Sequence, residues 1–212
     1  MNKTRAIFFL FTAILIGCSN APLNLEIAKQ RVVKYYDSGK YDSDLDEIVK
    51  QAENKFGSIK PGDSTVVVFD IDETIFSSYE FEKQIGFGYV ESMWYNYIME
   101  SKDPLIKQTK SLYDFLLSKG FKIIFLTGRN ADQYDATYKN LIYDGFTKFD
   151  TLIVRQPAEY DFTALKFKSI KRVELTNKGY NIAGTIGDQY SDLEGPDHGV
   201  QVKIPNYIYL IK

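Results

Sequence analysis

Hydrophobic and polar positions follow two different periods along this chain. In LEIAKQRVVKYY (25–36) and DLDEIVKQAENKF (44–56), apolar residues recur at intervals of three and four, which predicts two N-terminal helices. Further along, short apolar runs bounded by turn residues are typical of buried strands. We expect strands over residues 65–70, 121–126, 151–155 and 181–187, followed by edge strands over 199–204 and 206–211.

Helix signals lie between these strands. Asp103 offers a helix N-cap and Pro104 suits the first helical position, which predicts a helix that runs to the next glycine. Asn130 and Gln133 resemble a capping box that opens a second helix, and a third is expected near residues 168–178. Near-continuous apolar strands that alternate with amphipathic helices favour a parallel sheet. The predicted fold class is therefore α/β, a Rossmann-like, doubly wound parallel sheet with helices on both faces.

The segment between the first two expected strands is a short insert. Residues 75–101 predict a small, cap-like helical element, because five apolar positions share one helical face that would pack on the core. These positions are Val90, Met93, Trp94, Tyr97 and Ile98. The loop EFEKQIGFGY (80–89) contains two glycines. As a hypothesis, it forms a lid that carries Phe87 or Tyr89 toward a bound ring.

The N-terminus has the pattern of an export signal. MNKTR supplies two positive charges, and the apolar run over residues 6–17 is shorter than the roughly 20 residues that span a bilayer. The run ends in LIGC, which is similar to the bacterial lipobox and makes Cys18 the expected site of lipid attachment. We expect a signal peptide over 1–17, a lipid-anchored tether over 18–22 and one domain over 23–212. Such a protein would lie in a bacterial cell envelope and touch the membrane only through its lipid. The alternative is an ordinary signal peptide followed by a core cysteine.

Composition narrows the chemistry. With 44% hydrophobic residues the chain can bury a sizeable core, and a net charge of −2 without a basic stripe argues against nucleic-acid binding. Cys18 is the only cysteine and His198 the only histidine. This scarcity argues against cysteine phosphatases, histidine nucleophiles, Ser-His-Asp hydrolases and multi-histidine zinc sites. Any reaction must use carboxylates, lysine and hydroxyl groups, with or without a hard metal ion.

Chemically versatile residues follow three of the expected strands, at the carboxyl ends where parallel sheets form their sites. They are Asp70, Asp72, Thr127, Gly128, Asp188 and Asp192, with Lys168 on the helix before the fourth strand. Taken singly each signal is weak, since an Asp-x-Asp pair is more often a turn, a cap or a calcium loop than a catalytic pair. Together, at one edge of one sheet, they predict a single site.

Four stretches carry a family resemblance. FDIDET, FLTGR, FKSIKR and GDQYSDL, in this order, resemble the four motifs of the haloacid dehalogenase superfamily of phosphatases. More narrowly, the chain is similar to the acid phosphatase branch, which includes plant vegetative storage proteins and bacterial lipoprotein acid phosphatases. The resemblance covers roughly residues 64–195. Two positions depart from the pattern and could alter substrate fit: Tyr190, where the plant proteins favour tryptophan, and Ser78, where relatives often have asparagine.

The resemblance implies an acid phosphatase that hydrolyses phosphate monoesters through an aspartyl-phosphate. Asp70 would be the nucleophile, and Asp72 would protonate the departing alkoxide and later activate water. One Mg²⁺ ion would be held by Asp70, the backbone carbonyl of Asp72, and Asp188. Asp192 would hold the waters of the ion or orient Asp188. A cation is needed because a phosphate dianion repels an anionic nucleophile.

Three further groups would hold the transferring phosphoryl group. Thr127 and the backbone amide of Gly128 would hydrogen-bond its oxygens, and Lys168, at the start of a helix, would neutralise charge on phosphate and nucleophile. Lys168 is preferred over the neighbouring lysines because FKS matches the family pattern. The expected substrates are small phosphomonoesters, with nucleotides as one candidate class.

Several roles and functions stay open. Glu73 is left out of the catalytic set because the backbone direction turns it away from Asp72. Arg129 could contact substrate or pair with a nearby carboxylate, and His198 is expected in a surface loop. A response-regulator receiver is disfavoured because it carries its phosphorylated aspartate on a strand in the middle of the chain, and not in an Asp-x-Asp pair after the first strand. A non-catalytic, storage-type lipoprotein that keeps the fold remains an alternative, as does phosphotransfer to an alcohol in place of water.

Overall fold

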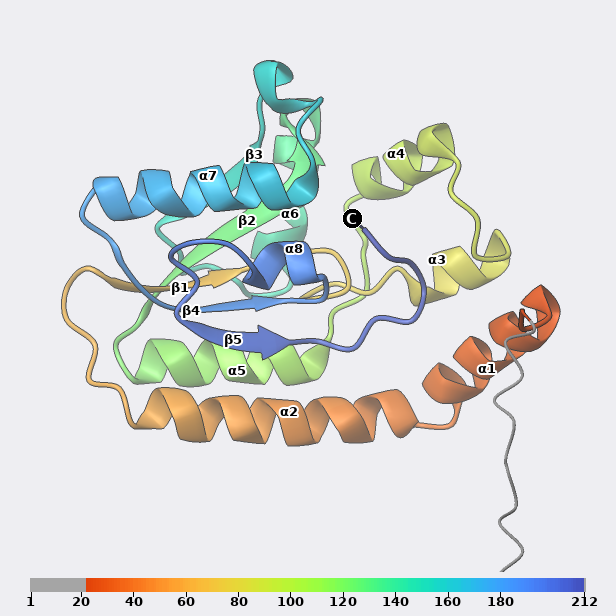
Figure 1. The fold of residues 1–212 in the computed structure, drawn as a ribbon, viewed down its shortest axis with the longest axis horizontal. Helices are drawn as coiled ribbons and strands as arrows, with labels where there is room; N and C mark the ends of the chain where they lie inside the picture. Colours follow the sequence, from red (N-terminus) through yellow and green to blue (C-terminus); the bar gives the residue numbers. More distant parts are fainter. Residues whose placement is uncertain (1–21, 212) are drawn as a thin grey trace, which may run out of the picture.

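A five-stranded sheet in the order β3-β2-β1-β4-β5 lies at the centre of the protein, and every neighbouring pair of strands is parallel (Figure 1). The computed structural model describes residues 22–211. The strands are β1 Thr65–Phe69, β2 Lys122–Asn130, β3 Thr151–Arg155, β4 Asn181–Gly187 and β5 Val200–Lys203. The central strand is β1, and both of its neighbours come much later in the chain. The predicted parallel α/β sheet is confirmed.

Helices cover both faces of this sheet. Figure 1 shows α2 and α5 along one face and α7 over the other. The helices are α1 Leu25–Asp37, α2 Lys40–Gly57, α3 Tyr79–Gln84, α4 Glu91–Met99, α5 Lys107–Ser118, α6 Tyr134–Tyr143, α7 Ala164–Asn177 and α8 Tyr190–Leu193. Two 3-10 turns, η1 Ala131–Gln133 and η2 Pro157–Glu159, follow β2 and β3. This is the doubly wound arrangement that the sequence predicts.

Alternate residues of the central strand face opposite helical layers. Val67 and Phe69 pack in the cluster that includes α2 and α5, whereas Val66 and Val68 pack with Phe167 of α7. A strand that is buried on both faces needs apolar residues at successive positions, which explains the unbroken run in β1. The first acidic residue comes directly after the strand, at the carboxyl edge of the sheet.

The start of α5 differs from the prediction. The helix begins at Lys107 with Ile106 as its N-cap, so Asp103 and Pro104 lie outside it. Asp103 is unavailable as a cap because its buried carboxylate pairs with Arg129, whose Nη2 lies 2.5 Å away. A residue predicted to stabilise a helix end therefore belongs to a buried ion network.

The start of α7 also differs. The helix begins four residues earlier than expected, because Thr163 caps it by accepting a hydrogen bond from the Lys166 amide at 3.2 Å. Lys168 therefore lies in the second turn, and its predicted place at the helix N-terminus is wrong. The predicted capping box of Asn130 and Gln133 is confirmed and opens η1, directly before α6.

Residues 206–211 form no strand, contrary to the prediction, although the preceding edge strand is confirmed as β5. The Ile208 amide donates to the Asn206 side chain at 2.7 Å, and the Ile211 amide donates to Gln189 Oε1 at 3.0 Å. Because these amides bond to side chains, they cannot join a strand ladder. Residues 208–211 instead line a pocket together with Trp94 and Tyr95 of α4.

The insert after β1 forms the helices α3 and α4, but its predicted core-facing stripe is largely wrong. Of the five residues, only Ile98 is buried, while Val90 and Met93 are 47% and 42% exposed. The Tyr97 ring stacks on Phe81 of α3, with centroids 4.4 Å apart. The insert therefore packs partly on itself, beside the sheet.

Helix α1 is attached to this insert by an aromatic contact. Tyr36 stacks on Tyr79 of α3 with ring centroids 4.4 Å apart, and the Tyr79 hydroxyl donates to Asp37 at 2.7 Å. Asn24 caps the helix by accepting the Glu26 amide. The N-terminal helix and the insert thus support each other at one end of the sheet.

The predicted signal peptide over 1–17 and the lipid attachment at Cys18 lie outside the described residues. The signal peptide stays a prediction. Between residues 22 and 211, the structure contains no helix with the length and apolar character that crossing a bilayer requires.

Candidate active site

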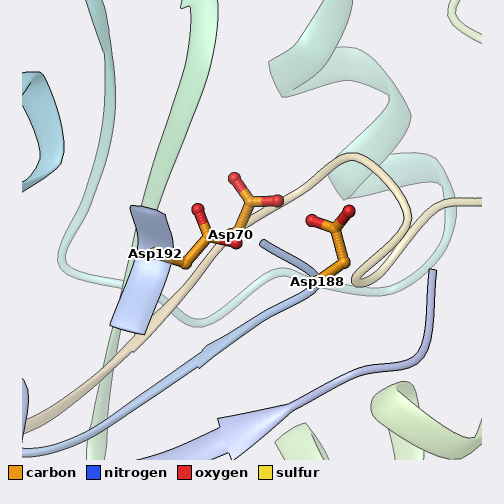
Figure 2. A group of neighbouring side chains, drawn as sticks. All are labelled: Asp70, Asp188 and Asp192. Carbon is orange, nitrogen blue, oxygen red and sulfur yellow. The ribbon is translucent and has the colours of Figure 1, made fainter. Parts of the chain in front are cut away.

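Three buried aspartates meet at the carboxyl edge of the sheet, as Figure 2 shows. Asp70 follows β1, Asp188 follows β4 and Asp192 lies in α8. One carboxylate oxygen of each lies within 4.8 Å of the others. The Asp70 amide donates to the Ile186 carbonyl oxygen at 2.9 Å, which extends the pairing of β1 with β4. Two strand ends far apart in sequence thereby bring their acidic residues together.

Gly187 allows Asp192 to approach the end of β4. A Cβ atom at position 187 would lie 2.3–2.6 Å from side-chain atoms of Asp192, closer than real Cβ atoms come. From another side, the Gln189 amide donates to Asp192 Oδ2 at 2.8 Å. Because Gly187 has no side chain, the Asp192 carboxylate can lie against the end of β4.

A buried arginine fixes the turn that carries Asp192. Arg172 of α7 donates from Nη1 to the Asp192 carbonyl oxygen at 2.6 Å and from Nε to that of Pro196 at 3.0 Å. Its Nη2 donates to the carbonyl oxygen of Glu194. Sequence reasoning missed this residue, because a clamp onto backbone carbonyls leaves no pattern in the chain.

Lys168 reaches the acidic cluster from the helix above it. Its Nζ lies 2.5 Å from Asp70 Oδ1 and also contacts Asp192. Burial alone would lower the pKa of Lys168, but the charges of Asp192 and Asp70 outweigh burial and raise it. Lys168 therefore stays charged beside Asp70.

The cluster holds more negative than positive charge. Burial raises the pKa of Asp188 to about 7, with Asp192 adding to the rise and Asn206 opposing it. Burial likewise raises the pKa of Asp70 well above its usual range, against the pull of Lys168. A bound divalent cation would supply the missing positive charge, and carboxylate oxygens are the ligands that hard cations take. The donor set therefore fits a divalent metal ion.

Two amide side chains orient Asp188. Gln189 Nε2 and Asn206 Nδ2 donate to Asp188 Oδ2 at 2.6 and 2.7 Å. Such partners keep a potential metal ligand in one orientation. Sequence reasoning missed both residues. Asn206 follows β5 at the same edge of the sheet, and this position is the one feature of the sequence that could have indicated a role in the site.

Asp72 does not join the acidic cluster with its carboxylate. It pairs with Arg129, whose Nη2 and Nε donate to Asp72 Oδ1 at 2.7 and 3.0 Å. Thr127 Oγ1 donates to the same carboxylate at 3.4 Å. The Asp72 side chain remains 20% exposed, at the wall of a pocket. Of the two roles left open for Arg129, the structure shows the pairing with a carboxylate.

Arg129 has a second acidic partner, Asp103, which sequence reasoning had assigned to a helix cap. Arg129 Nη1 also donates to Thr137 Oγ1 at 3.1 Å. Asn140 of α6 accepts the Asp103 amide at 2.9 Å. Burial raises the pKa of Asp103 to about 6, although Arg129 pulls it down. Asp103, which follows shortly after the insert, is therefore linked to Asp72 through Arg129.

An open pocket of about 680 Å³ lies over these residues, within the size range of small-molecule sites. Its lining includes Asp70, Asp72, Gly128, Lys168, Asp188 and Asp192. Thr127 is fully buried behind this wall. Phe87 and Tyr89 also line the pocket, and Tyr89 is 74% exposed. The predicted site residues are thus gathered around one cavity.

Two residues lie outside the cluster, as expected. Glu73 is buried, and its carboxylate accepts hydrogen bonds from the amide and hydroxyl groups of Ser78. His198 bonds to the Gly199 carbonyl oxygen and does not line the pocket.

Comparison with known proteins decides the family. Residues 16–212 match the family model of the HAD superfamily, subfamily IIIB (acid phosphatase). The chain belongs to this family. The resemblance seen in the motifs is confirmed, and this subfamily IIIB acid phosphatase is a phosphoric monoester hydrolase.

Curated relatives of this subfamily IIIB protein agree. A stem 31 kDa glycoprotein of Glycine max is 33% identical over 84% of this chain and 72% of its own length. Acid phosphatase 1 of Solanum lycopersicum is 31% identical over 84% of this chain and 73% of its own. Vegetative storage protein 1 of Arabidopsis thaliana is 30% identical over 94% and 75%.

These relatives correct one prediction. They come from soybean, tomato and Arabidopsis, and they point to a plant protein. The predicted location, as a lipoprotein anchored through Cys18 in a bacterial cell envelope, is therefore contradicted.

Solved structures share the fold. The class C acid phosphatase from Bacillus anthracis superposes with a TM-score of 0.71 at 20% identity, covering 88% of this chain and 85% of that one. The structure of that enzyme with tungstate bound gives a TM-score of 0.66, covering 87% of each chain. At this identity the likeness concerns the fold.

Proposed function

We propose that this acid phosphatase hydrolyses small phosphomonoesters with Mg²⁺ as its metal and Asp70 as its nucleophile. One observation carries the proposal. Asp70 is a buried carboxylate that lines an open pocket, contacts the ammonium group of Lys168 at 2.5 Å and belongs to an acidic cluster that fits a divalent cation. Without nearby positive charge, a phosphate dianion would repel such a nucleophile.

The proposed reaction has two displacements. A carboxylate oxygen of Asp70 attacks phosphorus, the bond from phosphorus to the alcohol oxygen breaks, and Asp72 gives its proton to that oxygen. Asp72 then takes a proton from water, whose oxygen attacks phosphorus and releases phosphate and the free Asp70 carboxylate. Arg129 supports both proton transfers by holding Asp72 at the wall of the pocket.

Asp70, Asp188 and the backbone carbonyl of Asp72 would hold Mg²⁺, with Asp192 close enough to orient these ligands or to hold a water. When bound, the ion supplies positive charge to the phosphoryl oxygens and to the nucleophile. Lys168 adds its own ammonium group, which reaches the site from the second turn of α7.

Two groups from β2 complete the proposed phosphoryl site. Gly128 lines the pocket and would offer its backbone amide, while Thr127 lies behind it. Thr127 Oγ1 already accepts the Arg129 amide at 3.2 Å, which helps to hold the irregular end of β2, where the pairing with β3 shifts register. Such preformed donors suit phosphoryl transfer, in which positioning supplies most of the catalysis.

We also propose that the insert over residues 75–101 is a partial cap. Phe87 and Tyr89 line the pocket from this side, where they could contact the ring of a nucleotide or aryl substrate. Phe87→Ala should change the ratio of kcat/KM between a nucleoside monophosphate and 4-nitrophenyl phosphate. An unchanged ratio would remove Phe87 from the site.

The deciding experiment measures hydrolysis of 4-nitrophenyl phosphate by the wild-type chain, with Mg²⁺ and with chelator, beside Asp70→Asn. We expect turnover to require the metal and to fall by a factor on the order of 10⁴ or more in Asp70→Asn. Asp46→Asn is the matched control, because Asp46 is an exposed aspartate on α2 that does not line the pocket. Chelator-resistant turnover, or equal loss in the two variants, would refute the proposal.

The same assay separates two further functions. One relative is named a storage protein, so a storage-type protein that keeps the fold but lacks turnover is the main alternative. Absence of phosphate release across several metals and pH values would favour it. Glycerol added as an acceptor tests phosphotransfer, since a transferase would form glycerol phosphate at the expense of free phosphate.

A further inference from the structure

Arg155 stands at the end of β3, on the wall of the same pocket but away from the acidic cluster. Because β2 lies between β3 and β1, two strand spacings separate Arg155 from Asp70, or about 10 Å across the sheet. Arg155 pairs in register with Asn130, beyond the Leu126–Ile153 pair. The backbone of Arg155 therefore lies to one side of the acidic cluster, two strands away from Asp70.

One part of the Arg155 side chain is firmly held. Nη1 donates to the carbonyl oxygens of Phe162 at 2.6 Å and Glu159 at 3.2 Å. The guanidinium also lies over the Phe167 ring, 4.9 Å from its centroid. These contacts set the orientation of the planar group without neutralising its charge.

The remaining part of the guanidinium has no partner among residues 22–211. Nε and Nη2 donate no hydrogen bond there, and no carboxylate oxygen of the described residues lies within 4 Å of Arg155. The nearest acidic residue in sequence, Glu159, pairs with Lys171 at 2.6 Å and accepts the Gln156 amide. Burial lowers the pKa of Arg155, and the charge of Glu159 offsets this lowering only in part.

The free side of the guanidinium is next to the proposed phosphoryl site. A Cβ atom built on Gly128 would lie 3.9 Å from Arg155 Nε, with no closer contact. Nε and Nη2 form the edge with which arginine binds carboxylates and phosphates through two parallel hydrogen bonds. An oriented guanidinium edge that has no hydrogen-bond partner among residues 22–211 and lies beside an open pocket is suited to an anion.

We propose that Arg155 binds a second anionic group on the substrate, either a carboxylate or a second phosphate, within about 10 Å of the reacting phosphorus. This inference rests on the proposed phosphatase function and narrows its substrate class. The enzyme favours phosphomonoesters that carry a further negative charge over neutral analogues of the same shape.

The test compares two substrates that differ by one anionic group, phenyl phosphate and 3-carboxyphenyl phosphate. The measured quantity is the ratio of their kcat/KM values, in wild type, Arg155→Gln and Arg155→Lys. We expect Arg155→Gln to reduce the preference for the carboxylated substrate about tenfold, as for loss of a charged hydrogen bond. Arg155→Lys should give an intermediate ratio, because lysine keeps the charge but cannot form the two parallel hydrogen bonds of a guanidinium group. Comparing ratios removes the effect of the carboxylate on the leaving group.

Lys166→Gln is the matched control. Lys166 is an exposed cation at the start of α7, 3.7 Å from the centroid of the Phe162 ring, and it does not line the pocket. Its removal changes the net charge equally and should leave the ratio unchanged. A ratio in Arg155→Gln equal to that of wild type would overturn the inference, since a purely structural role, or contact with the transferring phosphoryl group, reduces turnover of both substrates alike.

A failure of the phosphatase function itself is distinguishable. If neither substrate turns over, the same comparison is made by calorimetric binding of phenylphosphonate and 3-carboxyphenylphosphonate, which cannot be hydrolysed at the P–C bond. A tenfold binding preference that depends on Arg155 supports the inference in that case. Equal affinities in wild type and Arg155→Gln refute it.

Discussion

A methyl group at Gly187 tests whether the position of Asp192 controls activity. In Gly187→Ala the new Cβ would meet Asp192 at 2.3–2.6 Å, whereas ordinary contacts begin at 3.4 Å. Asp192 must therefore move by about 1 Å away from position 187, which changes its contact with Lys168. A displacement of this size in a catalytic centre reduces the rate about 10²-fold. We expect a loss of that order in kcat/KM for 4-nitrophenyl phosphate.

Gly184 in the same strand provides the control. A Cβ there would lie 2.5 Å from the Phe56 ring and 2.8 Å from the Val200 carbonyl oxygen, far from the acidic cluster. Overpacking of this kind costs about 1–3 kcal/mol of stability. Since each kcal/mol shifts the melting temperature of a domain this size by about 2–4 °C, Gly184→Ala should melt several degrees lower. Its kcat/KM at 25 °C should stay within a factor of about three.

The assay is kcat/KM at saturating Mg²⁺ together with the melting temperature of each folded variant. A crossed result supports the reasoning: Gly187→Ala loses activity out of proportion to its stability, and Gly184→Ala does the reverse. If Gly187→Ala keeps wild-type kcat/KM, the placement of Asp192 has no bearing on the reaction, and its proposed role must be abandoned.

Three further predictions concern buried charges. Burial raises the pKa of Asp103 to about 6, so the folded protein binds more protons than the unfolded chain between about pH 4 and 6. In chemical denaturation, the unfolding free energy of wild type should therefore fall by about 3 kcal/mol relative to Asp103→Asn as pH rises through this window; parallel curves would contradict it. Mg²⁺ at about 100 times its Kd should stabilise the protein by about 2.7 kcal/mol and raise its melting temperature. Asp188→Asn should lose most of this rise. Identical melting of wild type with metal and with chelator would exclude the metal site. Arg172→Met leaves three carbonyl groups without their donor, one of them buried and two partly buried, so we expect a loss of about 3 kcal/mol in unfolding free energy. Unchanged stability would show that water replaces the arginine.

The sequence pattern was sufficient to predict a structural feature where a single physical cause determines that feature. The run in β1 is apolar because both faces of the strand are buried, so its position could be predicted directly from the chain. Asp70 and Asp188 could be predicted to meet because parallel strands end at one edge of a sheet. Neither inference requires knowledge of a distant side chain.

The errors arose where a local signal has two physical causes. Asp103 followed by proline resembles a helix cap, but the same carboxylate can pair with a distant arginine, and only the fold shows which partner it has. The spacing of apolar residues predicted α4 correctly but not which surfaces it covers, so Met93 remains exposed. Residues 206–211 contain strand-forming residues, yet their amides bond to the side chains of Asn206 and Gln189.

The central position of β1 also affects how the protein is made. TVVVF emerges early from the ribosome, but one edge finds no partner until β2 begins at Lys122, and the other waits for β4 at Asn181. An uncharged, strand-forming segment exposed for so long is prone to aggregate. Truncated chains that end between Lys122 and Asn181 should be insoluble without chaperones. The strand that places Asp70 is therefore also the segment that most needs protection during synthesis.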